Sequence, residues 1–206
     1  MVDANGYPPE PWRLCGQMHV SLWWVPEARL PELPAGLATA VRPVTAAGRG
    51  LVATAWVDYQ RGSVLQYREL LAAVLVREGV RLRASITGIW VDSVASRDGG
   101  RELWGIPKEL ATLGFGAELR AGGIATARIL PGRQLPGRWP LRGSVTQLLA
   151  GRAKTTPVRA RAGLQLAKAH WRLPAGGPLG YLHRHHPWLT VTLRDFEMVF
   201  GRALPR

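Results

Sequence analysis

The sequence predicts a mainly β (α+β) fold: a closed or nearly closed antiparallel β architecture with a few short helices. Three observations favour it. Apolar and polar residues alternate with a period of two in several segments, as they do on half-buried strands. The 24 glycines and 16 prolines separate these segments at short intervals. Segments with helical spacing are few, and many short strands with few helices are typical of closed β structures.

The strand candidates are distributed along the chain and share this alternation. They cover residues 18–24, 51–59, 63–76, 80–87, 117–120, 124–130, 157–172 and 188–200. Residues 121–123, Ala-Gly-Gly, lie between two of them and predict a hairpin turn. Residues 131–142 are rich in proline and glycine, so we expect a loop there.

Helix candidates are limited to two segments. Residues 30–40 have room for one short turn. Residues 101–113 form the stronger candidate, but Pro107 lies inside it, and proline is destabilising in a helix interior. We therefore expect the helix to be divided at Pro107, with a second piece that begins at Pro107 and ends before Gly114, which places Lys108 in the first turn of that piece.

The length of 206 residues fits one ordinary domain, and no internal repeat divides it, so we expect a single domain over residues 1–206. The longest aliphatic run, residues 70–76, is far shorter than the about twenty residues of a membrane-spanning helix. Residues 1–9 have no basic start and no apolar stretch, which argues against a secretory signal. Cys15 is the only cysteine, so no intrachain disulfide is possible, and we expect a cytoplasmic protein.

The net charge of +13 is unevenly distributed. Residues 119–194 hold thirteen basic side chains and no acidic one, so the whole excess lies in this basic block. Such a block can bind nucleic acid or another polyanion. The arginines are scattered, however, no zinc-finger, KH or RRM signature accompanies them, and 24 arginines against 3 lysines are typical of a high-GC genome. We do not expect a nucleic-acid partner; the rival hypothesis, a polyanion-binding module, requires binding that weakens steeply with salt.

Glu69 interrupts an otherwise apolar strand face. In residues 63–75 the odd positions share one face, and Glu69 lies on it between Tyr67 and Leu71. An unpaired buried carboxylate costs several kcal/mol, so Glu69 should have a partner or a raised pKa. The alternative is a bulge that turns Glu69 into solvent.

Only three lysines are available for amine chemistry on a carbonyl, apart from the N-terminus, because arginine stays protonated. Lys168 shares a strand face with Leu164 and Leu166, so it is either an interior amine or a lysine at the wet rim of a strand. Lys108 lies at the expected helix start, where the helix dipole disfavours an ammonium by about 0.3–1 kcal/mol. The alternative for Lys108 is a solvated lysine on the first turn of that helix.

Three histidines close together invite a metal interpretation. They are His183, His185 and His186, and the acids nearest to them in sequence are Asp195 and Glu197. No cysteine lies near them. We therefore expect a solvated loop rather than a metal site.

Two motifs resemble those of the acetoacetate decarboxylase family. Residues 100–110, GRELWGIPKEL, resemble the segment in which an apolar stretch, a proline and then a lysine carry the family's Schiff-base lysine, and Lys108 stands at that position. Residues 65–69, LQYRE, resemble the family's Tyr-x-Glu strand, with Glu69 at its active-site glutamate. The two motifs stand in the family's order and at a similar separation.

The resemblance implies a cone-like antiparallel β-barrel whose lysine lies in a closed apolar cavity. It implies that the Lys108 amine attacks a keto acid to give an iminium, through which a β-keto acid such as acetoacetate loses CO2. Lys108 and Glu69 are then the catalytic residues, and Tyr67, Trp104 and Glu109 lie at the substrate. The resemblance implies no cofactor, no metal and a homo-oligomer. The mechanism needs a neutral amine, and lowering a lysine pKa from about 10.4 to about 7 requires desolvation above all.

The chain departs from the family pattern at two places. Glu109 stands where the decarboxylases have a second lysine directly after the nucleophile, and a carboxylate beside an amine raises the amine's pKa unless it points away. Gly16 or Gln17 stands where the family has an arginine. Relatives with similar departures do aldol condensation and dehydration on 2-oxo acids such as pyruvate, which is one alternative. A barrel that binds a small apolar or keto-acid ligand without turnover is the other.

Overall fold

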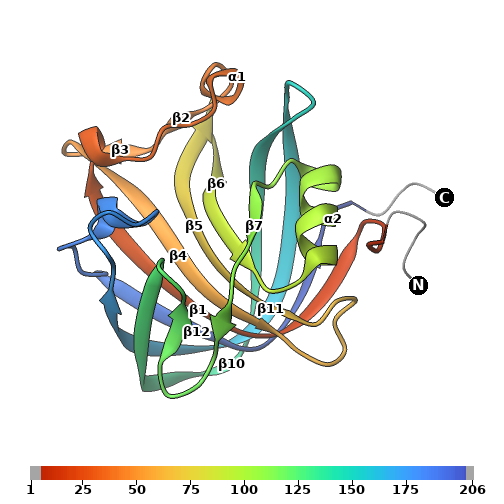
Figure 1. Cartoon of the computed structure of the whole chain (residues 1–206), viewed down its shortest axis with the longest axis vertical. Coiled ribbons are helices and arrows are strands. Elements are labelled where there is room, and N and C mark those ends of the chain that lie inside the picture. Colours follow the sequence, from red (N-terminus) through yellow and green to blue (C-terminus); the bar gives the residue numbers. More distant parts are fainter. Residues whose placement is uncertain (1–5, 203–206) are drawn as a thin grey trace.

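The computed structural model describes residues 6–202, in which a long curved sheet winds into a barrel (Figure 1). Residues 1–5, which begin the segment without a secretory-signal pattern, and residues 203–206 lie outside the described range. Within that range no helix is both long enough and apolar enough to cross a membrane.

Strands dominate the structure. They are β1 (Trp12–Pro26), β2 (Arg42–Pro43), β3 (Thr45–Ala46), β4 (Arg49–Tyr59), β5 (Tyr67–Glu78), β6 (Arg81–Val91), β7 (Lys108–Leu110), β8 (Leu113–Gly114), β9 (Leu119–Ala121), β10 (Ala125–Leu149), β11 (Arg152–Arg172) and β12 (Leu189–Phe200). The helices are α1 (Ala35–Ala38) and α2 (Val94–Trp104), with short 3-10 turns at Glu27–Arg29 and Gly180–Leu182.

The long strands form a closed ring. Antiparallel pairings connect β6, β5, β4, β1, β12, β11 and β10 in that order. The second half of β10 then returns to β6, where Val145 pairs with Ala84 in parallel. The short strand β7 pairs with β6, and β9 pairs with the first half of β10. The predicted mainly β, antiparallel barrel with few helices is confirmed.

The alternation of side chains along each strand separates two apolar clusters. In β4, Ala55 and Tyr59 belong to a cluster that faces the barrel interior, where residues of every strand of the ring surround one cavity. Trp56, between them, belongs to the cluster on the outer face. Residues from 111–129 and 173–182 cover that outer cluster. The inner face is the one that positions the site.

Residues 131–142 are part of β10 and pair with β11, so the predicted loop is wrong. Proline cannot donate a hydrogen bond to a strand ladder, and glycine weakens a strand. The ladder accommodates them by shifting register between Pro131 and Gln134, and again between Gln134 and Arg138. The proline and glycine content therefore marks irregularities within a strand rather than a connection between strands.

The helix predicted to begin at Pro107 is also wrong, because the helix lies earlier in the chain. The side chain of Ser93 caps the N-terminus of α2, and Gly105 ends the helix in the left-handed conformation with a φ of 66°. A Cβ at Gly105 would lie 2.2 Å from the carbonyl oxygen of Leu148, so the close approach also requires glycine. Lys108 consequently begins a strand, and no helix dipole acts on it from its own segment. The short turn predicted over 30–40 is confirmed as α1.

Candidate active site

The barrel interior encloses a cavity of about 240 Å³ beside α2. Its walls are mainly apolar and include Leu71, Ile89 and Met198. Four of its lining residues carry polar groups that lie close together: Tyr59, Tyr67, Glu69 and Lys108. The cavity is therefore an apolar chamber with one polar region.

Lys108 reaches this region because of how β7 is placed. Lys108 pairs with Ile89 of β6 in parallel, and the lysine side chain is buried. The Arg101 guanidinium donates a hydrogen bond from Nε to the Lys108 carbonyl oxygen at 2.7 Å, which ties the strand to α2. Gly100 of α2 makes room for the lysine stem, since a Cβ there would lie 2.7 Å from Lys108 Cδ.

Glu69 lies on β5, with its side chain buried in the interior as the alternation predicts. It pairs with Val57 of β4 on one side and Val91 of β6 on the other, so it sits within the ladder and not on a bulge. The register shift between β5 and β6 comes further along, between Ala72 and Ala73. The solvent-facing alternative for Glu69 is thereby excluded.

The Lys108 amine meets three oxygen atoms. Its Nζ lies 2.9 Å from Glu69 Oε2, 2.9 Å from Ser96 Oγ and 3.2 Å from Tyr67 OH. The other carboxylate oxygen of Glu69, Oε1, accepts a hydrogen bond from Tyr59 OH at 3.1 Å. Three acceptors match the three donors of an ammonium group. The geometry is therefore that of a lysine paired with a buried carboxylate.

The electrostatic balance at Lys108 differs from the expected one. Burial lowers the pKa of Lys108, but the Glu69 carboxylate and Tyr67 raise it by more, so the net pKa lies above the ordinary 10.5. The expectation that desolvation brings this pKa down toward neutrality is wrong for the unliganded protein, because the lysine has a direct partner. Burial raises the pKa of Tyr67 to about 12, against the lowering influence of Lys108, so the phenol keeps its proton at neutral pH.

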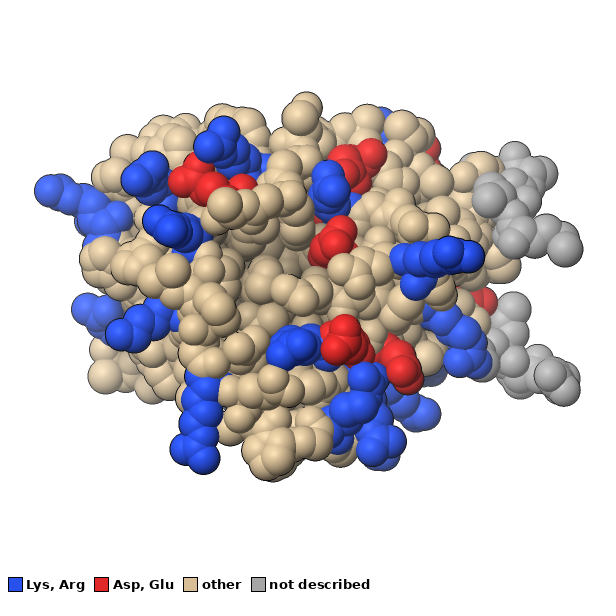
Figure 2. Space-filling view, turned by 90° about the horizontal axis from the view of Figure 1, so that it is seen from below, with Lys and Arg blue, Asp and Glu red and all other residues tan. Residues whose placement is uncertain are grey.

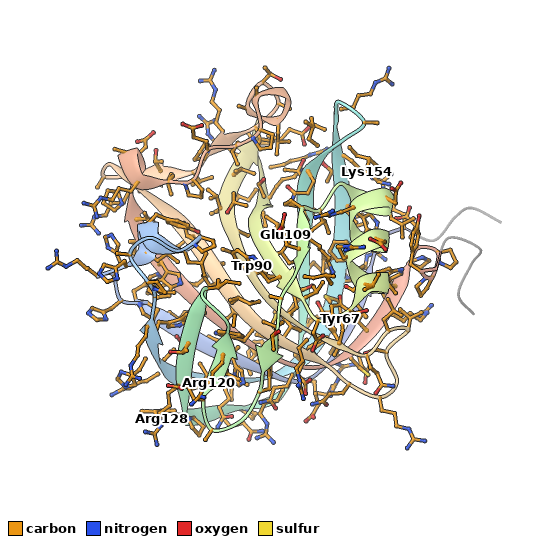
Figure 3. All side chains as sticks on the ribbon, in the orientation of Figure 1. Tyr67, Trp90, Glu109, Arg120, Arg128 and Lys154 are labelled. Atoms are coloured by element: carbon orange, nitrogen blue, oxygen red, sulfur yellow. The ribbon has the colours of Figure 1, made fainter. Side chains whose placement is uncertain are left out.

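Of the two remaining residues predicted to lie at the substrate, Trp104 lines the cavity and Glu109 does not. The Trp104 ring packs edge-on against Trp12 at a centroid distance of 4.9 Å. The Glu109 side chain is exposed, with a carboxylate oxygen 3.6 Å from the Arg101 guanidinium (Figure 3). Neighbouring residues of a strand point to opposite sides, so the burial of Lys108 turns Glu109 away.

The other two lysines lie outside the cavity. Lys154 donates from Nζ to the carbonyl oxygen of Leu103 at 2.7 Å, at the C-terminal end of α2 (Figure 3). A lysine there satisfies an open carbonyl and complements the helix dipole. Lys168 is exposed on β11, so the interior alternative for it is wrong. Lys108 is the lysine that lines the chamber.

The histidine cluster makes local contacts. His183 Nδ1 lies 2.7 Å from the carbonyl oxygen of Leu173. In residues 6–202, no three His, Cys, Asp or Glu side chains come together as a set that could hold a metal ion.

Basic side chains do not form a single stripe on the face of the molecule seen from below. Figure 2 shows Lys and Arg side chains spread over this face, with acidic side chains among them. Some arginines of the block pair with acids outside it: Arg120 lies 2.9 Å from Glu118, and Arg138 lies 3.2 Å from Glu197.

Sequence reasoning missed two members of the polar region. Tyr59 ends a predicted strand on the same face as Ala53 and Ala55, so the parity that located Glu69 could have located it. Ser96 carries no such signal, because it lies on α2, and that helix was expected elsewhere in the chain.

Comparisons with known proteins give one family and several similar folds. The family model described as acetoacetate decarboxylase (ADC) matches residues 7–135. The acetoacetate decarboxylase of Legionella pneumophila is 18% identical, with 97% of this chain and 89% of that chain covered and a TM-score of 0.64. The enduracididine biosynthesis enzyme MppR, complexed with pyruvate, is 15% identical, with 97% and 92% covered and a TM-score of 0.64.

An acetoacetate decarboxylase-like enzyme from Sphingomonas wittichii RW1 is 14% identical, with 98% and 96% covered and a TM-score of 0.60. At these identities the likenesses show the fold alone. The comparison with curated proteins gives no match.

Proposed function

The chain belongs to the acetoacetate decarboxylase family, and on that premise we propose that it is a Schiff-base-forming lyase acting on a keto acid, most simply a decarboxylase of acetoacetate or a related β-keto acid. One observation carries the proposal: the Lys108 amine is buried in an apolar chamber, 2.9 Å from the Glu69 carboxylate. Lys108 is the nucleophile and Glu69 the proton acceptor and donor, while Tyr67 and Trp104 lie where the substrate binds.

The first step is a proton transfer within the pair. The ammonium of Lys108 gives a proton to Glu69 Oε2 across the 2.9 Å hydrogen bond, which leaves a neutral amine beside a neutral carboxylic acid. Burial disfavours the charged form of each group, so an apolar surrounding reduces the cost of this exchange. Displacement of water from the chamber when a ligand enters favours the neutral pair further.

The neutral amine then attacks the ketone carbon of the substrate. The carboxylic acid of Glu69 returns its proton to the carbonyl oxygen, and the carbinolamine loses water to give an iminium on Lys108. In a β-keto acid the bond to the carboxylate carbon breaks, CO2 leaves, and the electron pair moves to the iminium nitrogen to form an enamine. Glu69 is again a carboxylate once the iminium has formed, so it takes up a proton from solvent and passes it to the enamine carbon. Water then hydrolyses the resulting iminium, which releases the ketone and regenerates the Lys108 ammonium beside the Glu69 carboxylate.

The chamber suits the loss of CO2. Among residues 6–202 no arginine lines it, so a substrate carboxylate inside would face apolar walls and phenol groups without a guanidinium partner from this part of the chain. An uncompensated carboxylate is costly in such surroundings, whereas the departing CO2 is neutral. The Tyr67 phenol keeps its proton and is available to donate a hydrogen bond to a developing negative charge.

A second candidate is an aldolase-dehydratase acting on pyruvate or another 2-oxo acid. The fold neighbour MppR is described with pyruvate and with the condensation product of pyruvate and imidazole 4-carboxaldehyde. In that chemistry the Lys108 iminium would lose a proton from the adjacent carbon to Glu69, and the enamine would attack an aldehyde. Both reactions begin with the same iminium on Lys108. They differ in the next step, because only the decarboxylation releases CO2.

Borohydride trapping tests the shared step. Each keto acid, acetoacetate or pyruvate, is incubated with the protein, reduced with sodium borohydride and analysed by intact-mass spectrometry. The expected result is an adduct on the wild type that Lys108→Ala loses and that Lys168→Ala, the matched exposed-lysine control, retains. Release of CO2 from acetoacetate, or condensation of pyruvate with an aldehyde, then separates the two candidates. A folded wild type that forms no adduct with either keto acid would instead favour a binding barrel.

A further inference from the structure

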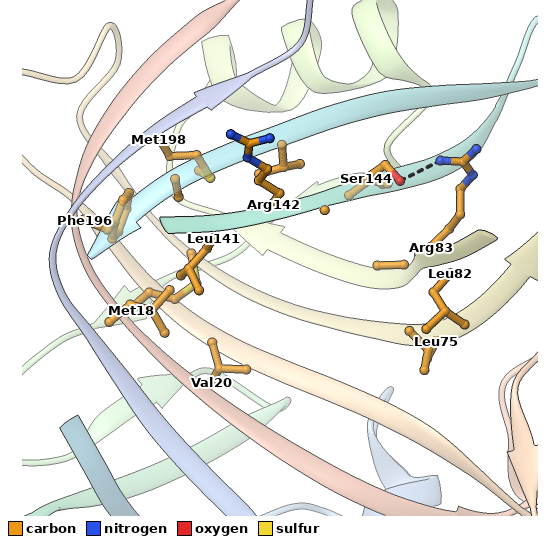
Figure 4. Close-up of a pocket in the computed structure, with 16 residues that line it drawn as sticks. Met18, Val20, Leu75, Leu82, Arg83, Leu141, Arg142, Ser144, Phe196 and Met198 are labelled. Atoms are coloured by element: carbon orange, nitrogen blue, oxygen red, sulfur yellow. Dashed lines mark hydrogen bonds between the residues drawn. The ribbon is translucent and has the colours of Figure 1, made fainter. Parts of the chain in front are cut away.

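The chamber around Lys108 continues into a larger space within the barrel, which we call the annex. The annex has a volume of about 560 Å³ (Figure 4). It shares six lining residues with the Lys108 chamber: Met18, Val20, Ala84, Val145, Val158 and Met198. Because the shared residues come from five strands of the ring, the two spaces are parts of one barrel interior.

The annex is apolar along most of its length. Leu75, Leu141, Leu193 and Phe196 line it without lining the Lys108 chamber (Figure 4). Ala160 does the same from β11. The side chains of these five residues offer no hydrogen-bond partner to a ligand, whereas they favour contact with hydrocarbon.

The polar side chains that line the annex are those of Arg83, Arg142 and Ser144. Arg83 donates to Ser144 Oγ at 2.8 Å and to Glu78 Oε2 at 2.8 and 2.9 Å, so its guanidinium is engaged. Arg142 and Leu82 are exposed lining residues. The annex therefore runs from the solvent side at these residues toward the polar region that holds Lys108.

The sizes of the two spaces distinguish classes of substrate. Sites for drug-sized ligands hold about 300–1,000 Å³. The Lys108 chamber, about 240 Å³, lies below that range and the annex, about 560 Å³, lies within it. Acetoacetate and pyruvate would leave the annex unfilled, because neither has an apolar group larger than a methyl to place there.

We propose that the substrate is a carbonyl compound with an extended apolar substituent, of which the carbonyl meets Lys108 and the substituent lies in the annex. This inference rests on the proposed function and names the substrate class of the same site. Each methylene moved from water into an apolar site favours binding several-fold, so affinity should rise with the length of the substituent.

Competitive trapping tests the inference with acetone and 2-nonanone as probes. Equal concentrations of both ketones are reduced with borohydride on the protein, and the two adducts, which differ in mass, are compared by mass spectrometry. The same ratio on an unfolded sample corrects for the ketones' own reactivity. On the wild type we expect the 2-nonanone adduct to exceed the acetone adduct at least tenfold.

Variants that fill the annex localise the effect. Ala160→Phe should reduce the ratio to near one while the acetone adduct persists, because Ala160 lines the annex and not the chamber. Leu193→Trp is the second variant in case Ala160→Phe does not fold. Leu166→Phe, at an exposed position of the same strand β11, is the matched control and should leave the ratio unchanged.

Calorimetric titration with the same ketones distinguishes a failure of this inference from a failure of the proposed function. Equal adducts on the wild type, unaltered by Ala160→Phe, would overturn the inference and leave the proposed function standing. No adduct, with 2-nonanone binding that Ala160→Phe abolishes, would overturn the function and keep the apolar ligand. Neither adduct nor chain-length-dependent binding would overturn both. An altered assembly size in Ala160→Phe with an unaltered ratio would assign the annex to contact with a second copy of the chain, which also overturns the inference.

Discussion

Lys108 Nζ and Glu69 Oε2 lie 2.9 Å apart, with only 5% and 4% of the two side chains exposed. The desolvation of two buried charges offsets most of their attraction, so the pair is a weak source of stability. Its consequence is chemical: the proton on the amine has an acceptor within one hydrogen bond. The reactivity that we propose for this amine therefore depends on Glu69 as much as on burial.

The first prediction concerns the pKa of Lys108. Glu69→Gln removes the carboxylate that raises this pKa and leaves burial, which lowers it. We expect the pKa of Lys108 to fall, because burial then acts without the opposing carboxylate. Labelling with a small acylating reagent over a range of pH, quantified at Lys108 by peptide mass spectrometry, measures the midpoint.

Glu109→Gln is the matched control for this change. The Glu109 side chain is 68% exposed and its carboxylate lies beside Arg101. The pH at which Lys108 is half labelled should therefore be the same in Glu109→Gln as in the wild type. A midpoint that is unchanged or higher in Glu69→Gln would contradict the assignment of Glu69 as the controlling partner.

The sequence indicated which residues of β5 share a face with Glu69, but it did not indicate that Lys108 lies on a strand. Alternation along one strand is a local property, so the residues around Glu69 predicted an interior position as one of two alternatives, and the strand pairings excluded the bulge. Lys108 lies in a short strand that exists because it pairs with β6, which is distant in sequence. The residue that decides this placement is Gly105, whose left-handed conformation ends α2 before Pro107.

The second prediction concerns the buried pair and stability. Lys108→Met alone leaves the Glu69 carboxylate buried without its partner, and we expect the free energy of unfolding to fall by about 3–5 kcal/mol. Lys108→Met combined with Glu69→Leu removes both charges and should recover most of this loss. Urea unfolding at neutral pH measures both. A double variant no more stable than Lys108→Met would mean that the pair is not the cause.

The third prediction follows from the raised pKa of Tyr67, about 12 in the folded protein. The unfolded state loses this proton near pH 10, so the folded state binds more protons above that pH. The contribution to stability is fully present below about pH 10 and is lost as the pH rises to about 12, by roughly 2–3 kcal/mol.

Tyr67→Phe removes this contribution. We expect its free energy of unfolding to decline less steeply than that of the wild type between about pH 10 and 12, as urea unfolding followed by tryptophan fluorescence would show. Burial, the largest cause of the raised pKa of Tyr59, is present in both proteins, whereas the smaller part that Tyr67 contributes to that pKa is lost with the Tyr67 phenol. Equal declines would show that the Tyr67 phenol titrates as it does in water.

The last prediction concerns the space that α2 leaves for the lysine. A methyl group at Gly100 would lie 2.7 Å from Cδ and 2.9 Å from Cε of Lys108, closer than carbon atoms pack. The lysine stem is fixed at both ends, by β7 and by the three oxygen atoms around Nζ, so it yields only by moving the amine away from Glu69. We expect Gly100→Ala to reduce the yield of borohydride-trapped imine at least tenfold, since a misplacement of about 1 Å costs on the order of a hundredfold in a positioned reaction. Gly116→Ala, where a Cβ meets no atom within 4 Å, is the matched control and should trap like the wild type. Circular dichroism confirms that both variants are folded, and a folded Gly100→Ala that traps as well as the wild type would show that the position of the amine is not set by this contact.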